Sequence, residues 1–150
     1  MRALTICQPY AELIMRREKL VENRNWGTHY RGALLIHAGK SRAWLSSFSP
    51  LPDRMDYGTI IGVVQVRGCI AFHPGKRLDP VVLEAWPWLD GHVHCEGPFC
   101  WILEDAYRFA QPVAFRGMQG IFDVPAGLVA VGLSEAMEAR KGKTCQSTPA

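Results

Sequence analysis

The chain has 150 residues, of which 48% are hydrophobic and 21% are charged, and its net charge is +3. This length and composition suit one globular domain with its own core, and no apolar run approaches the length of a membrane span, which excludes a membrane-spanning protein. The first residues lack the apolar stretch of a secretory signal, so we expect a cytoplasmic protein with no membrane partner.

Charge and cysteine usage narrow the class further. Residues 1–44 carry eight Lys and Arg against three Glu, whereas residues 45–110 carry five basic and eight acidic residues. A basic N-terminal third indicates either an anionic partner such as nucleic acid or simply a solvated basic face. Because the cysteines are odd in number and irregularly spaced, we expect free thiols at all five positions: Cys7, Cys69, Cys95, Cys100 and Cys145.

The first third of the chain predicts short alternating elements. Residues 3–7 (ALTIC) are typical of a buried strand, and the following proline opens a predicted helix over about 9–17. Residues 19–24 (KLVENR) have the parity of a second strand. A turn-rich segment leads to the continuous apolar run 33–39 (ALLIHAG), which predicts a central strand, and a short helix is predicted over 40–48.

Longer strands are predicted in the rest of the chain. Residues 58–72 are rich in β-branched side chains, with Gly62 and Gly68 as candidate bulge sites. Within residues 78–89 a helix is predicted that Pro87 ends, and a long strand follows at 98–109. Shorter elements follow: strands at 112–117 and 120–125, helical turns within 126–141, and a polar tail, 142–150, expected to be disordered. About six strands with few, short helices predict an α+β fold, a small mixed or antiparallel β-barrel in a single domain of residues 1–141.

The segment REKLVENR, residues 17–24, places many charges between two apolar elements. If Val21 faces the core, Glu22 and Arg24 share the opposite strand face, and Lys19 can reach the same side. A carboxylate between two cations can act as a base or an acceptor, while the cations can bind phosphate. The same residues could instead form surface ion pairs, worth roughly 0–1 kcal/mol.

REKLVENR resembles the G-x-K-x-x-E-x-R motif of the ASCH (activating signal cointegrator homology) domain family. Lys19, Glu22 and Arg24 match its charged positions, whereas Arg17 stands where the family usually has Gly. The segments ALTICQPYAELI, NWGTHYRGALLIHAGK, GTIIGVVQVRGCI and GIFDVP are similar to the surrounding parts of the family, so the resemblance covers roughly residues 3–133.

The resemblance implies a PUA-like fold, in which helices flank a cleft that holds the motif. It also implies nucleic-acid handling, since some relatives are described as nucleic-acid binders, some as ribonucleases, and one branch as amidohydrolases of acetylated cytidine with Thr in place of Glu22. We therefore expect a charged cleft that binds RNA or single-stranded nucleic acid. Its catalytic version would be a metal-independent ribonuclease in which Lys19 and Arg24 stabilise developing charge and Glu22 acts as base. A non-catalytic reader of a modified nucleoside and an amidohydrolase acting on an acylated cytidine are the alternatives.

Aromatic and cationic residues near the motif are candidates for nucleic-acid binding. Tyr10, Trp26 and Tyr30 could stack on bases, although Tyr10 and Trp26 could equally pack in the core. Arg17 and Arg31 would add positive charge to the cleft.

Three further features are candidates for ligand or metal contact. Lys40 could reach a phosphate or simply follow a strand end, and Gln119 in the loop RGMQG could read a base edge or belong to a plain turn. His92, His94 and Cys95 could hold zinc, but their spacing is not a usual structural-zinc pattern, so we expect no metal and no cofactor.

Overall fold

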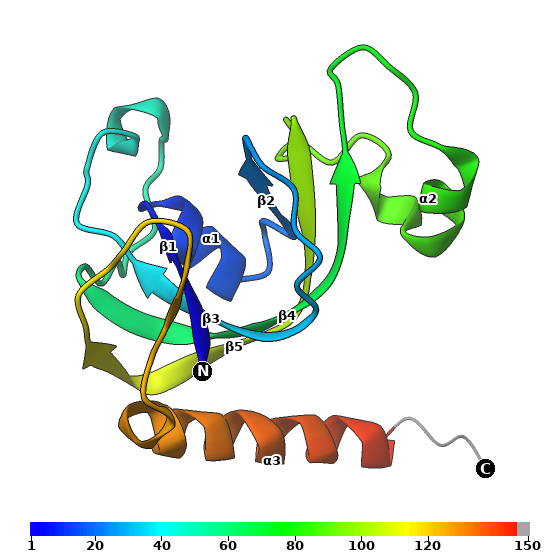
Figure 1. Ribbon diagram of the computed structural model, residues 1–150. Coiled ribbons are helices and arrows are strands. Elements are labelled where there is room, and N and C mark those ends of the chain that lie inside the picture. Colours follow the sequence, from blue (N-terminus) through cyan, green and yellow to red (C-terminus); the bar gives the residue numbers. More distant parts are fainter. Residues whose placement is uncertain (147–150) are drawn as a thin grey trace.

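The computed structural model describes residues 1–146, with side chains through residue 142. Six strands form one sheet in the order β2-β5-β4-β3-β1-β6, and the sheet curls into a half-barrel (Figure 1). β1 and β3 pair in parallel, and the other neighbours are antiparallel. The strands are β1 (Arg2–Ile6), β2 (Val21–Arg24), β3 (Gly32–Ala38), β4 (Thr59–Ala71), β5 (Phe99–Ala114) and β6 (Ile121–Asp123). The predicted PUA-like α+β fold is confirmed.

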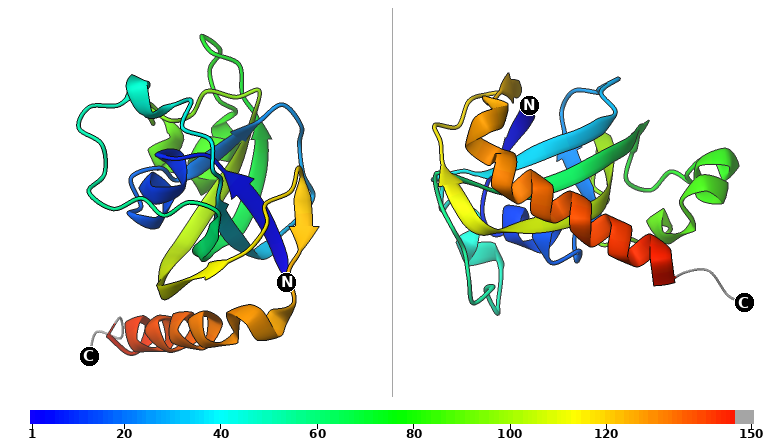
Figure 2. Two further views of the ribbon diagram at one scale, coloured as in Figure 1. Left: turned by 90° about the vertical axis from the view of Figure 1, so that its left-hand side faces the viewer. Right: turned by 90° about the horizontal axis from the view of Figure 1, so that it is seen from below.

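Short helices cover this sheet. α1 (Tyr10–Met15) lies within the curl of the sheet, α3 (Ala130–Gln146) crosses its outer side, and α2 (Pro80–Ala85) projects away from both (Figures 1 and 2). The single-turn 3-10 helices are η1 (Leu45–Ser47), η2 (Pro87–Leu89) and η3 (Ala126–Val129). No helix among the described residues combines the length and apolar character that crossing a membrane would require.

The two faces of the sheet build two cores because side chains alternate along each strand. On β3, Leu34 and Ile36 join the core beneath α1, while Leu35 joins the core beneath α3. Gly132 lets α3 lie directly on β5, because a Cβ there would come within 2.5 Å of the Phe109 ring. A third, smaller core beneath α2 and η2 packs on the edge of the sheet beside β2.

The pairing of β4 bears out the predicted bulges, since its register with β5 shifts next to Gly62 and Gly68. Other boundaries differ from the sequence-based expectation. The segment 40–48 contains only one 3-10 turn, and β5 absorbs the start of the strand predicted at 112–117.

The C-terminal helix is also longer than expected. α3 continues to Gln146, beyond residue 141, from a preceding stretch of strong helix formers, Ala, Glu, Met, Arg and Lys. The first part of the expected disordered tail is therefore helical, and residues 147–150 lie outside the described residues.

Candidate functional site

The turn between α1 and β2 positions the start of the motif. Arg17 adopts φ 61°, the left-handed conformation that glycine favours, at the position where the motif usually has Gly. Its Nε and Nη2 donate to the carbonyl oxygen of Ala106, at 3.3 and 2.9 Å. The guanidinium is therefore held against β5, and Arg17 does not line the cavity that the charged motif residues share.

The three charged motif residues converge at the edge strand β2. Lys19 Nζ lies 3.5 Å from one Glu22 carboxylate oxygen, and Arg24 Nε lies 3.2 Å from the other. Lys19 also donates to the Val21 carbonyl oxygen, and Arg24 Nη2 donates to that of Thr5, each at 2.6 Å. The side chains of Lys19 and Glu22 are only 3% and 9% exposed, so this is a largely buried ionic group rather than a surface pair.

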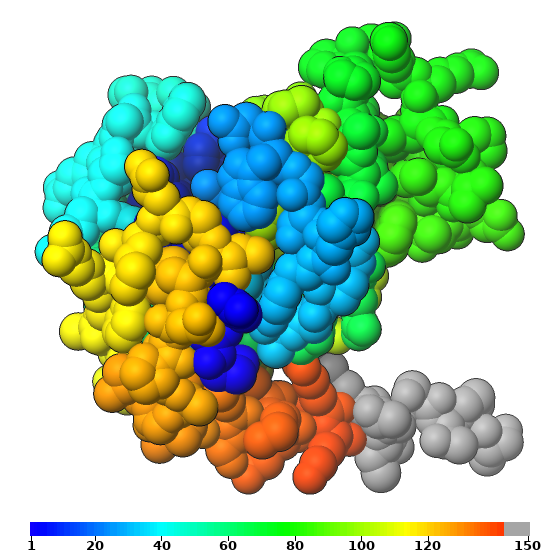
Figure 3. Space-filling view, viewed as in Figure 1, coloured from blue at the N-terminus to red at the C-terminus, as the bar shows by residue number. Residues whose placement is uncertain are grey.

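These heads form the wall of a cavity of about 320 Å³, here called the motif cavity. Figure 3 shows a recess between the cyan segment that contains η1 and the blue segment that contains β2, with darker N-terminal residues at its base. The residues lining the motif cavity are Tyr10, Lys19, Glu22, Asn23, Arg24, Trp44 and Glu96.

Aromatic rings make up one side of the motif cavity. Lys19 Nζ lies 5.4 Å from the centre of the Tyr10 ring, a cation–π distance. Tyr10 in turn packs edge-to-face against Trp44 and Phe48, at 6.1 and 5.2 Å between ring centres. Burial raises the pKa of Tyr10, and the negative charges of Glu96 and Glu22 raise it further, so its hydroxyl is a neutral donor at pH 7.

A loop from the α2 side closes the opposite wall. Asn23 Nδ2 donates to the carbonyl oxygen of His94 at 2.8 Å, and Asn23 Oδ1 accepts from the backbone N–H groups of Glu96 and Gly97, at 3.1 Å each. Asn23 thus fixes the segment that carries the Glu96 carboxylate into the motif cavity.

The predicted zinc candidates lie on this loop. His92 Nε2 accepts a hydrogen bond from the Leu20 backbone N–H at 3.3 Å, so it already has a partner. Burial lowers the pKa of both His92 and His94, with His94 and Lys19 adding to the effect on His92. Among residues 1–142, whose side chains are described, no group of three or more His, Cys, Asp or Glu side chains is placed to hold a metal ion.

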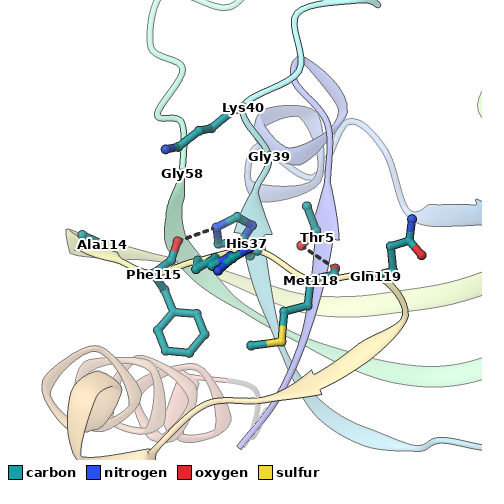
Figure 4. Close-up of a pocket in the computed structure, with 11 residues that line it drawn as sticks. Thr5, His37, Gly39, Lys40, Gly58, Ala114, Phe115, Met118 and Gln119 are labelled. Atoms are coloured by element: carbon teal, nitrogen blue, oxygen red, sulfur yellow. Dashed lines mark hydrogen bonds between the residues drawn. The ribbon is translucent and has the colours of Figure 1, made fainter.

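Lys40 and Gln119 line a different and larger cavity of about 880 Å³, here called the His37 cavity (Figure 4). It lies where the ends of β1 and β3 meet the loop between β5 and β6. Its lining residues are Thr5, His37, Gly39, Lys40, Gly58, Ala114, Phe115, Arg116, Gly117, Met118 and Gln119.

The other predicted binding residues line neither cavity. Trp26 packs edge-to-face on the core residue Trp101, with 4.7 Å between ring centres. The Tyr30 hydroxyl donates to the Ala33 carbonyl oxygen, and Arg31 donates to backbone carbonyls within its own turn. The structure thus places Trp26 in the alternative position weighed from the sequence, on the core.

Sequence reasoning missed Trp44, Asn23 and Glu96 at the motif cavity. Trp44 does carry a signal, since it is an aromatic residue in the polar, basic stretch KSRAW, and the structure leaves it 50% exposed. Asn23 and Glu96 carry no comparable signal, because their roles depend on a loop about seventy residues away in the chain.

A six-stranded sheet that curls into a half-barrel, with α1 within its curl and α3 on its outer side, is a PUA-like fold. The ASCH domain family model matches residues 4–112, and the chain belongs to this family. No curated protein sequence matches the chain.

Two solved structures share the fold. The crystal structure of ASCH from Zymomonas mobilis has a TM-score of 0.53 at 13% identity, covering 89% of this chain and 93% of that one. A tyrosine-to-phenylalanine mutant of the same Zymomonas mobilis protein has a TM-score of 0.50 at 13% identity, with coverage of 89% and 96%. At this identity the likeness shows the fold alone.

Proposed function

We propose that the motif cavity binds one nucleotide of an RNA or another single-stranded nucleic acid. The observation that carries this proposal is the burial of Lys19 and Glu22, beside the partly buried Arg24, along the wall of one cavity. Removing charges from water is costly, and a surface pair would avoid that cost, so buried charges that line a cavity are concentrated at functional sites.

The contacts within the motif leave hydrogen-bonding capacity for a ligand. An ammonium has three N–H donors and a guanidinium has five. In the described structure Lys19 contacts Val21 and Glu22, and Arg24 contacts Thr5 and Glu22. The remaining N–H groups suit a phosphate oxygen or the acceptor edge of a base.

The aromatic side of the cavity suits a base. Tyr10 and Trp44 line it together, and stacking on such rings contributes about 1–3 kcal/mol per base. A volume of about 320 Å³ is at the small end of ligand sites, which favours a single base over a larger folded RNA element.

Binding of a labelled single-stranded RNA, followed by fluorescence anisotropy, tests the proposal. Lys19→Met keeps the length of the side chain and removes the ammonium, so we expect binding at least about tenfold weaker, since a charged hydrogen bond contributes about 1.5–3 kcal/mol. Lys76→Met removes an exposed ammonium outside the motif cavity and is the matched control. Equal binding by wild type and Lys19→Met would contradict the proposal.

RNA cleavage without a metal is a second candidate, favoured by the 3.5 Å approach of an ammonium and a carboxylate in one cavity. Glu22 would accept the proton of a ribose 2′-hydroxyl as its oxygen attacks the adjacent phosphorus and the bond from phosphorus to the 5′-oxygen of the next nucleotide breaks. The products would be a 2′,3′-cyclic phosphate and a 5′-hydroxyl that takes its proton from water, while Lys19 and Arg24 would stabilise the charge that develops on the phosphate.

Incubation of RNA with wild type and Lys19→Met in excess chelator tests this step. Loss of cleavage in the variant supports catalysis by the motif, and equal cleavage by both proteins removes Lys19 from the mechanism. Tight binding without product identifies a non-catalytic reader, whereas release of acetate from an acetylated cytidine identifies the amidohydrolase alternative.

A further inference from the structure

His37 has an unused hydrogen-bonding atom in the wall of the larger cavity. The side chain is 2% exposed, and its Nε2 lies 3.0 Å from the Phe115 carbonyl oxygen (Figure 4). Because a carbonyl oxygen only accepts, Nε2 carries the hydrogen, and Nδ1 of the neutral ring is an acceptor. Nδ1 is buried without a hydrogen-bond partner among the described residues, which costs about 1–3 kcal/mol. His37 therefore lines the cavity with a neutral ring whose Nδ1 lies against Gly117.

Gly117 keeps the space beside this ring free of side-chain atoms. A Cβ at this position would lie 2.8 Å from both His37 Nδ1 and Thr5 Oγ1. Thr5 Oγ1 donates to the Met118 carbonyl oxygen at 3.0 Å and so ties the loop between β5 and β6 to β1. The glycine therefore permits a close approach between this loop and two polar side chains.

The charge of the cavity favours an anion. Lys40 and Arg116 line it, and none of its eleven lining residues is acidic. The Lys40 side chain lies across Gly58, where a Cβ would come within 2.7 Å of Lys40 Cε. These cations suit a phosphate, and Met118, which is 48% exposed, adds apolar surface, whereas the Phe115 ring stacks on Phe122 in the core beneath α3.

A hydrogen bond at the end of β1 joins a residue of the motif cavity to a residue of the His37 cavity. Arg24 lines the motif cavity and donates to the Thr5 carbonyl oxygen at 2.6 Å, while Thr5 itself lines the His37 cavity. One lining residue of each cavity is thus in direct contact with a lining residue of the other.

We propose that the His37 cavity binds a phosphorylated nucleotide, with its phosphate against Lys40 and Arg116 and its base against Met118. In a nucleic-acid strand, the nucleotide bound in the His37 cavity is the neighbour of the nucleotide bound in the motif cavity. This assignment within a strand rests on the proposed function. A free nucleotide presents the same chemistry, and a volume of about 880 Å³ accommodates either.

Calorimetric titration with a nucleoside monophosphate and with a 5′-phosphorylated RNA dinucleotide tests the proposal. The double variant Lys40→Ala/Arg116→Ala removes two exposed cations of the cavity, and Lys76→Ala/Lys141→Ala removes two exposed cations elsewhere. We expect the double variant to bind the dinucleotide at least about tenfold more weakly, with a salt dependence reduced by about 0.7 per lost phosphate contact. The control pair should keep wild-type affinity.

The ¹⁵N signal of His37 Nδ1 reports occupancy independently of affinity and should shift when the cavity is filled. A dinucleotide that binds equally to wild type and the Lys40→Ala/Arg116→Ala variant, without moving this signal, overturns the proposal and leaves the proposed function intact. If the protein binds the monophosphate only when Lys40 and Arg116 are present, and binds no RNA strand, the result supports the nucleotide site and overturns the proposed function. Absence of both kinds of binding overturns both.

Discussion

Glu22→Gln tests whether the motif is a buried ionic group. The substitution keeps the shape of the side chain but leaves Lys19, which is 3% exposed, without its carboxylate partner. Removing one partner of a buried pair costs about 3–5 kcal/mol. Because Arg24 is 24% exposed and partly screened by water, its pair with Glu22 adds little, and we expect the free energy of unfolding to fall by about 3 kcal/mol.

Lys19→Met should cost less than Glu22→Gln. It removes the hydrogen bond to Val21, but Glu22 keeps Arg24 at 3.2 Å, so we expect a loss of about 1–3 kcal/mol. The double variant leaves no uncompensated buried ammonium. Its loss of unfolding free energy should therefore be smaller than the sum of the two single losses, by about 1–3 kcal/mol. A domain typically unfolds with about 5–15 kcal/mol, so all three variants should fold.

Urea denaturation at pH 7, repeated at low and high salt, measures these free energies. A buried pair is poorly screened, so the coupling between Lys19 and Glu22 should change little with salt. A loss below about 0.5 kcal/mol for Glu22→Gln, with no coupling, would refute the reasoning, because such values belong to surface pairs. The double variant should still fail to bind RNA, which separates the role in binding from the effect on stability.

Three further predictions concern packing, pH and thiol reactivity. Gly132→Ala should lower the free energy of unfolding, measured in urea, by about 1–3 kcal/mol, because its Cβ would meet the Phe109 ring at 2.5 Å. Gly142→Ala in the same helix adds a Cβ that meets nothing within 4 Å, so it should be neutral or stabilising, and equal effects of the two variants would contradict the packing of α3. Burial lowers the pKa of His37, His92 and His94 in the folded state, so the unfolded chain takes up protons first as the pH drops below 6.5, and the free energy of unfolding should fall. NMR titration should find the pKa of all three below 6.5. Burial, with the neighbouring Cys100 thiol, raises the pKa of Cys95 to about 12, so iodoacetamide at pH 8 should alkylate Cys7 before Cys95. Peptide mass spectrometry measures the order of alkylation, and the reverse order would contradict this environment of Cys95.

The motif could be predicted because its arrangement is local. Strand parity places Glu22 and Arg24 on one face of β2, and Lys19 reaches the same side from the turn, at distances that the structure confirms. The turn at Arg17 has a left-handed backbone although the residue is not Gly, and the Arg17 side chain is held by its hydrogen bonds to the Ala106 carbonyl oxygen.

The rest of the site depends on long-range packing that no local pattern encodes. Trp26 and Trp44 are both aromatic residues in polar segments, yet one meets Trp101 from β5 and the other stays exposed beside Tyr10. What separates them is the partner on a distant strand. Glu96 likewise reaches the motif cavity only because Asn23 holds its loop.

The parallel pairing of β1 with β3 explains why these parts gather in one region. Ile6 pairs with Ala38, so both strands end together, and the Gly39 N–H donates to the Ile6 carbonyl oxygen at 2.8 Å. The chain that leaves β1 supplies Tyr10 to the motif cavity, and the chain that leaves β3 supplies Lys40 to the His37 cavity. The carboxyl ends of adjacent parallel strands are where ligands bind in open α/β sheets, and this mixed sheet has the same arrangement at its one described parallel pair. An antiparallel β1 would send these two segments to opposite ends of the sheet, so the neighbourhood of the two cavities follows from this single pairing.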